Sequence, residues 1–365
     1  MLNVDVKKCI NAGFDQDRLM ETAAILDEGA KRNLYPGGVL WVNRREIDAL
    51  VYSTGYTDFS RTIKVDHNTL YDLASLTKPI ATASAILLLA QDGLIHFDQH
   101  ISDLFPQRDL PHLRNVTLHH LLTHTSGLPV WQDLYSQDQT RTQAIDELFQ
   151  IKLINEPGTT YTYSCLGYII LGLVAEDISG VSLDQFCCKQ LFRPLGMNDT
   201  VWNPGSTSNY VIAVTDNCSY RHRKLVGEVH DGNSYALGGI SGNAGLFSTA
   251  ADIARYCSCV MFDNMYLPII KPMIDNVIAN KLTKSVGGQT YGWYIYPNHL
   301  MPGGDILSKH AIGHTGFTGT MAIIDPDNEL FIVLLTNRVC NNNDGLQFRN
   351  IRKKLINAIH GAIVC

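Results

Sequence analysis

Sequence with strand character is confined to the two ends of the chain, and this distribution limits the folds that are open to it. The stretch GGVLWVNRREIDALVYSTGY, residues 37–56, predicts two strands joined by a polar turn at Asn43–Arg45. Near the other end, GTMAIID and LFIVLLTN predict two more apolar strands, joined by a turn at PDNE. Amphipathic helices are expected beside them, over residues 17–32 and 348–364. The simplest packing brings both ends into one sheet that is layered with these helices.

The middle of the chain has a different pattern. The apolar run from Ser75 to about Gln91 predicts a buried helix that stops at Asp92-Gly93. From there to about Leu237 the pattern is mostly helical and is broken by long Pro/Gly loops such as INEPGTTYTYS. We therefore expect a mainly helical domain, residues 71–237, inserted into an α/β domain made of residues 1–70 and 238–365.

The composition is that of an ordinary globular enzyme, with 45% apolar and 18% charged residues. The chain has 29 Lys and Arg against 35 Asp and Glu, so its net charge is −6, and its pI is about 6.1. Because no long basic stripe is present, we do not expect nucleic acid as a partner. No segment approaches the ~20 apolar residues that a membrane span needs.

The N-terminus and the cysteines bear on the compartment. The N-terminal sequence contains no apolar core of signal-peptide length. If the sequence is complete, we expect a cytoplasmic protein, and if a signal peptide has been removed, the periplasm is the alternative. The nine cysteines include the adjacent pair Cys187-Cys188 but no C-x-x-C motif, so a zinc ribbon is not expected. Free thiols in a reducing compartment are the simplest interpretation.

The tetrad Ser75-Leu76-Thr77-Lys78 heads the buried helix of the middle region. Three residues apart on a helix, Ser75 and Lys78 lie on the same face. A serine hydroxyl is a weak nucleophile that needs a base, and a lysine can serve if burial or a cationic neighbour lowers its pKa. The unpaired N–H groups of a helix N-terminus can hold a developing oxyanion. Alone, this spacing is expected by chance in a chain of this composition, and a helix cap followed by a solvated lysine is then the better explanation.

Two further elements join the tetrad along the chain. Tyr163 follows a Pro-Gly loop and precedes an apolar helix, where it could shuttle a proton or pack as an ordinary core aromatic. His314-Thr315-Gly316 opens a predicted strand and is followed by small residues. An edge strand of this kind could offer its backbone groups to a substrate, and the alternative is a tight turn that feeds a hairpin.

In this order, Ser-x-x-Lys, a tyrosine and His-Thr-Gly resemble the motifs of the serine β-lactamases and penicillin-binding DD-peptidases. The resemblance is to the class C-like branch, with its related esterases and cell-wall amidases. It extends from about Val39 to about Arg338 and includes the runs LHHLLTHTSGLP, LFRPLGMNDT, GNAGLFSTAADIARY and VLLTNRV. It implies an α/β (α+β) fold of the β-lactamase/transpeptidase-like type. In that fold an antiparallel sheet is flanked by N- and C-terminal helices, a mainly helical domain is inserted, and the active site lies at the interface.

The resemblance also implies a role for each matched position. Ser75 would be the acylated nucleophile, Lys78 its immediate base partner, and Tyr163 the group that passes the proton to the leaving group and later activates water. The backbone N–H groups of Ser75 and Phe317 would form the oxyanion hole. The remaining expected substrate contacts are His314, Thr315, Gly316, Cys165, His230, and, beside a substrate carboxylate, Asn337 and Arg338. From their sequence context alone, His230 and Asp231 belong either to the cleft, where they could touch the substrate, or to a structural loop.

Two positions depart from the pattern of that family. Cys165 stands where many relatives have Asn or Asp, and a thiol is a poor hydrogen-bonding substitute. A helix N-terminus and a nearby ammonium favour a thiolate, so Cys165 is either a second reactive group or a small buried filler. His314 stands where β-lactamases carry lysine, and its charge is expected to be conditional near neutral pH. Both changes count against efficient β-lactam hydrolysis.

The sequence therefore predicts a serine hydrolase that forms an acyl-enzyme on amide or ester bonds. A cell-wall-derived peptide, including muropeptides, or a small ester is the expected substrate, and carboxypeptidase, amidase and esterase activities fit it. The alternatives are a β-lactamase and a non-catalytic binding or scaffold protein of the same fold. His120 and His124 have the spacing of a metal pair but lack the glutamate of a zinc-protease helix, so neither a metal nor another cofactor is expected.

Overall fold

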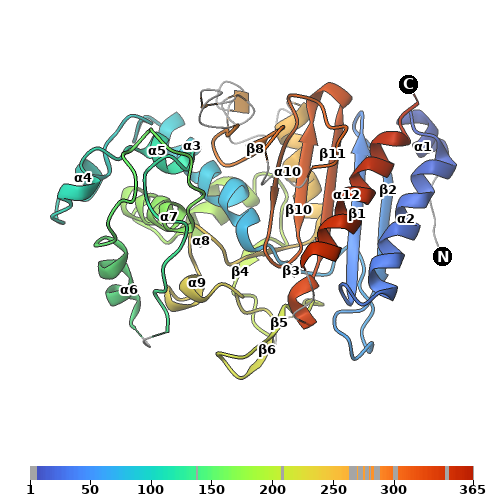
Figure 1. The fold of residues 1–365 in the computed structure, drawn as a ribbon, viewed down its shortest axis with the longest axis horizontal. Coiled ribbons are helices and arrows are strands. Elements are labelled where there is room, and N and C mark those ends of the chain that lie inside the picture. Colours follow the sequence, from blue (N-terminus) through green and yellow to red (C-terminus); the bar gives the residue numbers. More distant parts are fainter. Residues whose placement is uncertain are drawn as a thin grey trace.

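The computed structural model describes residues 6–136, 139–206, 209–262, 269, 274–275, 279, 281–282, 288–298, 303–341 and 345–364. Most of the helices lie on one side of the molecule and the main sheet lies on the other (Figure 1). At the sheet side, the first and last described parts of the chain meet, where Phe14 and Ile363 form an isolated antiparallel bridge. Cys365 lies outside the described residues.

The main sheet of the described residues has six strands in the order β2-β1-β11-β10-β9-β8, and all of its pairings are antiparallel. From the N-terminal part, β1 pairs with β11 of the C-terminal part, from Gly38 opposite Thr336 to Arg44 opposite Leu330. The prediction that both ends share one sheet is thus confirmed. The strands are β1 (Gly37–Arg44), β2 (Ile47–Gly55), β8 (Tyr294–Ile295), β9 (Ile312–Thr315), β10 (Met321–Asp325) and β11 (Leu330–Thr336).

The turn between β1 and β2 lies later than its polar residues suggest. Strand β1 continues through Arg44, and the turn consists of Arg45 and Glu46, which have φ values of +54° and +61°. Two left-handed residues give a turn whose twist matches that of the strands. Asn43 remains in the strand because its amide donates to Asp48 Oδ1 over 2.7 Å, so its polarity marks a buried hydrogen bond and not the turn.

Helices cover both faces of this sheet (Figure 1). On one face, α2 packs against α12, and their apolar residues share a core with those of β1, β10 and β11. On the opposite face, α10 packs on β1, β10 and β11. The amphipathic patterns at the two ends therefore predicted real helices. The helices beside the sheet are α1 (Val6–Asn11), α2 (Gln16–Lys31), α10 (Ala250–Phe262) and α12 (Gly345–Gly361).

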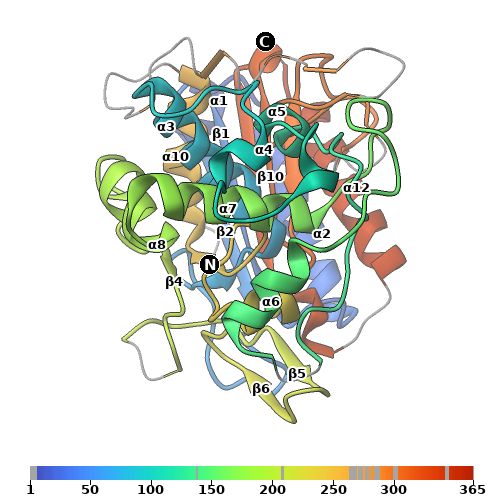
Figure 2. The same cartoon turned by 90° about the vertical axis from the view of Figure 1, so that its left-hand side faces the viewer.

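The other described helices form a group around α7, which belongs to it and is buried along most of its length (Figure 2). They are α3 (Ser84–Gln91), α4 (Ile101–Leu104), α5 (Leu118–Leu122), α6 (Arg141–Leu148), α7 (Cys165–Ser179), α8 (Leu183–Cys187) and α9 (Gly232–Ala236). Two small sheets accompany them, formed by β3 (Tyr71–Asp72), β7 (Leu246–Ser248) and β4 (Val201–Trp202), and by β5 (Asp216–Cys218) and β6 (Arg223–Leu225). Strand β7 pairs with β3 and so ties the segment before Ser75 to the chain that leads into α10.

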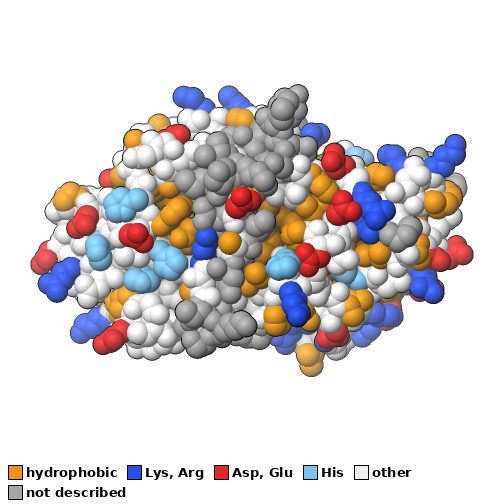
Figure 3. Space-filling model, turned by 90° about the horizontal axis from the view of Figure 1, so that it is seen from above, with side chains coloured by type: hydrophobic (Ala, Val, Ile, Leu, Met, Phe, Trp, Pro, Cys, Tyr) orange, Lys and Arg blue, Asp and Glu red, His pale blue; other side chains and the backbone are white. Residues whose placement is uncertain are grey.

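The surface carries charges of both signs (Figure 3), and the length and composition of the helices bear on whether one could span a membrane. Seen from above, side chains of both charge signs are interspersed, and histidines gather over the helical side (Figure 3). No single helix within the described ranges is long and apolar enough to cross a membrane. One pair, Cys165–Ser179 with Leu183–Phe192, reaches the required length and composition jointly and is bent by 73° between its two members.

A buried hydrogen bond between His360 and Asp325 joins the end of β10 to α12. His360 Nε2 lies 3.1 Å from Asp325 Oδ2, and the two side chains are 3% and 0% exposed. Burial opposes the charge of Asp325, but hydrogen bonds from His360, Ser308 and Asn328 outweigh it and lower the pKa of this carboxyl to about 2. The folded pKa lies below the unfolded value of about 3.9, so this stabilisation is complete above that value and is lost as the pH falls towards 2.

We therefore expect Asp325→Ala to lower the free energy of unfolding by about 3 kcal/mol at neutral pH, because it leaves His360 buried without its partner. About half of the carboxylate's pH-linked contribution should be gone by about pH 3. Urea unfolding of both proteins at these two pH values measures the difference. The matched control is Asp327→Ala, which removes an exposed partner of His310 and should change little. An equal loss in both variants would contradict this account.

Candidate active site

Ser75 lies at the start of an irregular helical segment. Strand β3 leads into a 3₁₀ turn over Ala74–Leu76, which is followed by a π-helical stretch over Lys78–Ala83 and then by α3. The regular helix predicted from Ser75 therefore begins only at Ser84. Directly before the serine, Ala74 has a left-handed φ of +46°. Such a conformation is costly for a residue with a side chain and persists only where its surroundings hold it.

Asp72 supplies the contacts that hold this turn. Its Oδ1 accepts a hydrogen bond from Ala74 N over 2.8 Å, and its Oδ2 accepts one from His230 N over 2.7 Å. Its carbonyl oxygen accepts the hydroxyl proton of Thr318 over 2.7 Å. The carboxylate is buried, which raises its pKa, while the bonds from His230 and Ala74 work against that rise. Asp72 thus joins three separate segments around the serine, a role that its sequence context did not reveal.

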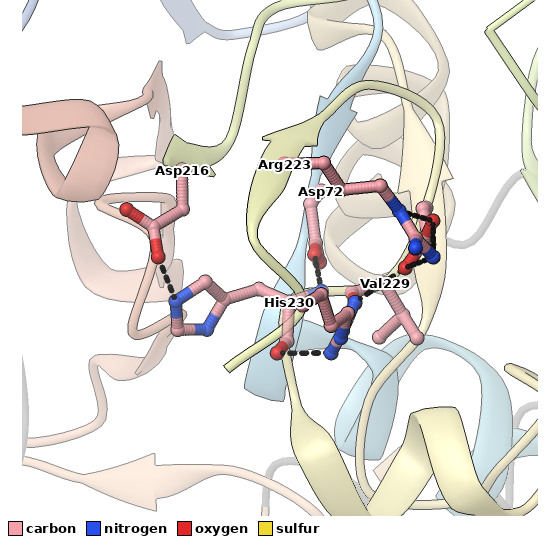
Figure 4. A network of polar contacts seen from close by, with 7 residues as sticks. Asp72, Asp216, Arg223, Val229 and His230 are labelled. Carbon is pink, nitrogen blue, oxygen red and sulfur yellow. Dashed lines mark hydrogen bonds and ion pairs between the residues drawn. The ribbon is translucent and has the colours of Figure 1, made fainter. Parts of the chain in front are cut away.

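The backbone of His230 contacts the carboxylate of Asp72, and its ring lies on the side of Asp216 (Figure 4). Its backbone N–H is directed to Asp72, while its ring is directed to Asp216, with Nε2 3.4 Å from Oδ2. Below it, the Arg221 guanidinium donates to Glu228 Oε1 and to the carbonyl oxygens of Val229 and His230. This network fixes the loop that carries His230, and it places the imidazole in the cavity described below.

Lys78 is fully buried beneath Ser75. Its Nζ donates to Ser75 Oγ over 2.9 Å and to the carbonyl oxygen of Asn243 over 2.8 Å. The Asn243 amide in turn donates to Asp231 Oδ1 over 3.1 Å and accepts from the Ser241 hydroxyl over 2.7 Å. The predicted pairing of Ser75 with Lys78 is therefore present in the structure, and Asn243 and Asp231 orient the lysine from the far side.

Tyr163 is positioned by the start of α7. Ser164 caps this helix, with Oγ accepting from Gly167 N, and its own N–H donates to His124 Nδ1 over 3.1 Å. The rings of His124 and Tyr163 are 4.6 Å apart, and Lys78 Nζ lies 5.2 Å from the centre of the Tyr163 ring. His124, which the sequence suggested only as half of a metal pair, thus packs against the tyrosine. His120 instead caps α5.

Burial and neighbouring charges set the protonation of this group. Burial lowers the pKa of Lys78, but Cys165 and Tyr163 raise it, and the resulting pKa is about 12. Burial raises the pKa of Tyr163, against the opposing effect of Lys78 and of hydrogen bonds from Ser75 and Lys78. The raised pKa of Lys78 depends on negative charge beside it, so its ammonium form is favoured when Tyr163 or Cys165 is ionised. A phenol beside an ammonium, as Tyr163 is beside Lys78, can act as a base once it has lost its proton.

This assignment predicts the pH dependence of catalysis. With a raised pKa for Tyr163, kcat/KM should rise about tenfold for each pH unit between about pH 6 and pH 9, because the deprotonated fraction rises in that proportion. Hydrolysis of a p-nitrophenyl ester, corrected for spontaneous hydrolysis, measures it. Tyr163→Phe should remove the slope together with most of the activity. A plateau that begins at or below pH 6 would show that the base has an ordinary or lowered pKa.

His314 lies at the end of β9 and is fully buried. Its ring stacks on Tyr294 at 4.5 Å and lies 6.1 Å from the ring of Tyr163, and its Nδ1 is 3.0 Å from the carbonyl oxygen of Thr315. Burial, followed by the charge of Lys78, lowers the pKa of His314 to about 3. The expectation of a conditional charge near neutral pH is therefore wrong, since the imidazole stays neutral throughout that range.

Strand β9 also differs from the predicted edge strand. The edge is β8, which pairs with Ile312 and Gly313 only, so the last two residues of β9 extend beyond it. After Thr315 the chain turns, with Gly316 N donating to the carbonyl oxygen of Thr320. A Cβ on Gly316 would lie 2.3 Å from the carbonyl oxygen of Leu73, so this position needs glycine for its close approach to the nucleophile turn.

This approach brings Phe317 towards Ser75. Thr318 and Thr320 donate their hydroxyl protons to the carbonyl oxygens of Asp72 and Leu73, which fixes the turn against the serine segment. Outside helices and strands, the described residues contain no backbone hydrogen bond donated by Ser75 N or Phe317 N. The role of these two N–H groups as an oxyanion hole, which the resemblance implies, stays a prediction.

A cavity of about 610 Å³ opens above Ser75. Of the predicted site residues it is lined by Ser75, Tyr163, Cys165, His230 and Phe317. Asp231, for which the sequence left the cleft and a structural loop open, lines it too. Its other walls come from residues that sequence analysis did not select as contacts: Ala74, Val130, Trp131, Tyr135, Asp216, Cys218, Ser219, Tyr220, Arg221, Gly232 and Ala244. His314, Thr315 and Gly316 are not among the lining residues. A second cavity of about 690 Å³, between α10 and the β1–β2 hairpin, contains no nucleophile and base pair.

Asn337 and Arg338 lie outside the cavity. Asn337 is 2% exposed, and its amide donates to the carbonyl oxygens of Thr57 and Val214 over 2.8 and 2.9 Å. The guanidinium of Arg338 lies over the rings of Phe317 and Phe348, at 4.9 and 5.8 Å from their centres. Neither side chain reaches the cavity, and their sequence gave no sign of these internal partners.

Cys165 begins α7 and lines the cavity. Burial raises the pKa of its thiol, and the opposing effect of Lys78 is smaller. The thiolate expected from the helix N-terminus and the nearby ammonium is thus outweighed by burial. We expect iodoacetamide at pH 8 to modify Cys165 more slowly than Cys218, which lines the same cavity, as measured by timed peptide mass spectrometry. Modification of Cys165 before every other cysteine would contradict this expectation.

Comparison with known proteins gives consistent matches. The model of the family described as Beta-lactamase matches residues 22–355. A "Putative D-alanyl-D-alanine carboxypeptidase" of Escherichia coli (strain K12) is 33% identical over 314 residues, which are 76% of this chain and 70% of that protein. A protein of the same description from Salmonella heidelberg (strain SL476) is 32% identical over 320 residues, or 78% of this chain and 73% of that protein.

Solved structures of low sequence identity share the fold. An octameric penicillin-binding protein homologue from Pyrococcus abyssi has a TM-score of 0.75 at 22% identity, over 94% of this chain and 77% of that one. A class C beta lactamase from Rhodobacter sphaeroides has a TM-score of 0.73 at 20% identity, over 93% and 99%. The family model spans nearly the whole chain, and the curated relatives exceed 30% identity. By its sequence and by its fold, the chain belongs to the beta-lactamase family.

Proposed function

We propose that this protein is a serine hydrolase that forms an acyl-enzyme on Ser75 and cleaves ester or amide bonds. The observation that carries the proposal is the 2.9 Å hydrogen bond from Lys78 Nζ to Ser75 Oγ at the floor of a cavity. A buried lysine is costly unless it is used, and Tyr163 lies beside it as a proton acceptor. The family match supports the same reaction class.

The proposed cycle has two halves. Before the reaction, the Lys78 ammonium stabilises the negative charge of the Tyr163 phenolate. Ser75 Oγ then attacks the carbonyl carbon and gives its proton to that phenolate. The carbonyl electrons move to oxygen, where the N–H groups of Ser75 and Phe317 hold the oxyanion. Collapse expels the amine or alcohol, which takes the proton from Tyr163. Water then attacks the acyl ester through the same groups, releases the acid and restores Ser75.

The assignment of Lys78 differs from the immediate base role that the resemblance implied. In the proposed cycle it stays an ammonium, because its pKa is raised to about 12 by the groups around it. Its two hydrogen bonds, to Ser75 Oγ and to the carbonyl oxygen of Asn243, orient that charge towards Tyr163. Lys78 is thus proposed to stabilise the Tyr163 phenolate whenever that proton is lost, and so to lower the cost of forming the base.

The same proposal covers the two parts of the chain that line the site, the substrate class and the cellular location. The helical insertion 71–237 and the α/β part supply opposite walls, with Ser75 and Tyr163 from the first and Phe317 from the second. The names of the curated relatives support a peptide substrate, including muropeptides. We also propose a cytoplasmic location, which is supported by the fact that all eight cysteines within the described ranges are free.

The test is a fluorophosphonate probe combined with a substrate panel. The panel contains p-nitrophenyl esters, D-Ala-D-Ala peptides, muropeptides and a chromogenic cephalosporin. Rapid labelling with turnover of an ester or peptide supports a serine hydrolase, and efficient turnover of the cephalosporin would support the β-lactamase alternative. A protein that binds these compounds but shows neither labelling nor turnover would be the non-catalytic alternative, and the proposal would then be abandoned.

A further inference from the structure

The mouth of the Ser75 cavity exposes an unusual amount of apolar surface. Val130, Trp131, Tyr220 and Phe317 line it and are 53%, 47%, 39% and 61% exposed. Between them lies Tyr135, whose ring centre is 6.5 Å from that of Trp131 and 5.0 Å from that of Tyr220. Clustered exposed aromatic side chains around a cavity indicate a surface that a ligand covers.

The charged groups of the same cavity are mainly carboxylates. Asp216 faces His230, and Asp231 accepts from Ser234 N and the Asn243 amide but has no ion pair within the described part of the chain. Tyr135 and Asp231 meet at Gly232, because a Cβ on that glycine would lie 2.4 Å from the Tyr135 ring. A carboxylate thus lies next to the aromatic wall. A substrate carboxylate placed here would meet a like charge.

The cations nearest to the cavity are already engaged. Arg221 also lines it, but its side chain is 3% exposed and forms an ion pair with Glu228 while donating to two backbone carbonyls. Lys78 is fully buried and donates to Ser75 Oγ and the carbonyl oxygen of Asn243. Arg338 lies over Phe317 and Phe348, outside the cavity walls. Within the described residues, therefore, no cation of the cavity wall is open to pair with a substrate carboxylate.

From this distribution we infer that the natural substrate is an ester or amide with a bulky apolar, planar group and without a carboxylate beside the scissile bond. Phe317 and Trp131 cover the apolar group, and Asp231 with Asp216 disfavours an anion. The inference rests on the proposed acyl-enzyme chemistry and narrows its substrate class. It sets this site apart from one that must hold the free C-terminal carboxylate of a peptide.

Three p-nitrophenyl esters with acyl chains of equal length test the charge preference. Their chains end in a methyl group, an ammonium group or a carboxylate. We expect kcat/KM to be about tenfold lower for the carboxylate than for the methyl ester. Asp231→Asn should narrow that ratio while keeping the Oδ1 acceptor that Ser234 N and the Asn243 amide use. Because the readout is a ratio within one protein, a general loss of activity cancels.

The matched control is Asp133→Asn, which removes a carboxylate that accepts from Tyr135 N but does not line the cavity. It should leave the ratio unchanged. Trp131→Ala tests the apolar wall and should lower kcat/KM about tenfold more for a phenylpropanoate ester than for an acetate ester.

The results distinguish a wrong substrate preference from a wrong reaction class. Equal or faster hydrolysis of the carboxylate ester, or a wild-type ratio in Asp231→Asn, would overturn the inference and leave the acyl-enzyme intact. If Trp131→Ala lowers kcat/KM equally for the phenylpropanoate and the acetate ester, the apolar wall does not contact the acyl group of the substrate. Hydrolysis of none of the esters, with no fluorophosphonate labelling, would instead remove the proposed function itself.

Discussion

Replacing Ser75 by alanine should abolish covalent labelling and lower turnover by about a millionfold, the loss seen when another serine hydrolase loses its nucleophile. The physical reason is that the Lys78 ammonium donates a 2.9 Å hydrogen bond to Ser75 Oγ at the cavity floor, which places this hydroxyl to attack a bound carbonyl. Stopped assays with an activated ester measure the rate. Circular dichroism and thermal unfolding establish that the variant is folded.

Ser84→Ala is the matched control, since Ser84 lies farther along the same helical segment and is buried too. Its hydroxyl bonds to Tyr256 OH over 2.9 Å and to the carbonyl oxygen of Pro79, away from the cavity. That variant should lose some stability and keep its labelling. Retention of more than about a thousandth of the wild-type turnover in Ser75→Ala would require another nucleophile, because oxyanion hole and binding alone leave only a small residue of catalysis.

Lys78 and Tyr163 should behave as one unit. Lys78→Met removes the charge that holds the phenolate, and Tyr163→Phe removes the phenolate itself, so each change should cost about a thousandfold in kcat. The double variant should cost little more than the worse single one, because the second change removes a group that the first has already disabled. Independent action would instead multiply the two losses to about a millionfold.

Trp131→Ala combined with Lys78→Met provides the additive reference, because Trp131 contacts the cavity mouth and not the proton path. The decrease in log kcat/KM caused by Trp131→Ala should add to the decrease caused by Lys78→Met. Methionine keeps the volume of the buried lysine stem and so limits collapse of the site. Multiplicative losses in the Lys78 and Tyr163 pair would mean that the lysine does not act through the tyrosine, and the proposed base would have to be reassigned.

The sequence could predict those parts of the fold that depend on residues close together in the chain. The alternating and continuous apolar runs at both ends predicted the strands, and pairing of β1 with β11 follows because each buries an apolar face. The spacing of Ser75 and Lys78 predicted their contact even though the segment is 3₁₀ and π-helical there and not regular. Side chains three residues apart lie on one face of a 3₁₀ turn, as they do on an α-helix.

What sequence could not predict depends on residues brought together from far apart. Asp72 precedes the serine by three positions, yet its role arises from His230 and Thr318, which lie more than a hundred residues away. Burial decides the charge of His314 and the pKa of Cys165, and burial is a property of the packed site. Asn337 resembles a substrate contact by position, but its amide is used by two carbonyl groups inside the protein.

The most direct test of the central claim is the position of the acyl group itself. The protein is mixed briefly with a slowly turned-over ester or a fluorophosphonate, quenched in acid and digested, and the modified peptide is sequenced by tandem mass spectrometry. The account predicts a single adduct on Ser75, within the peptide that contains Lys78, at one group per chain. An adduct on Cys165, or on any residue other than Ser75, would contradict it.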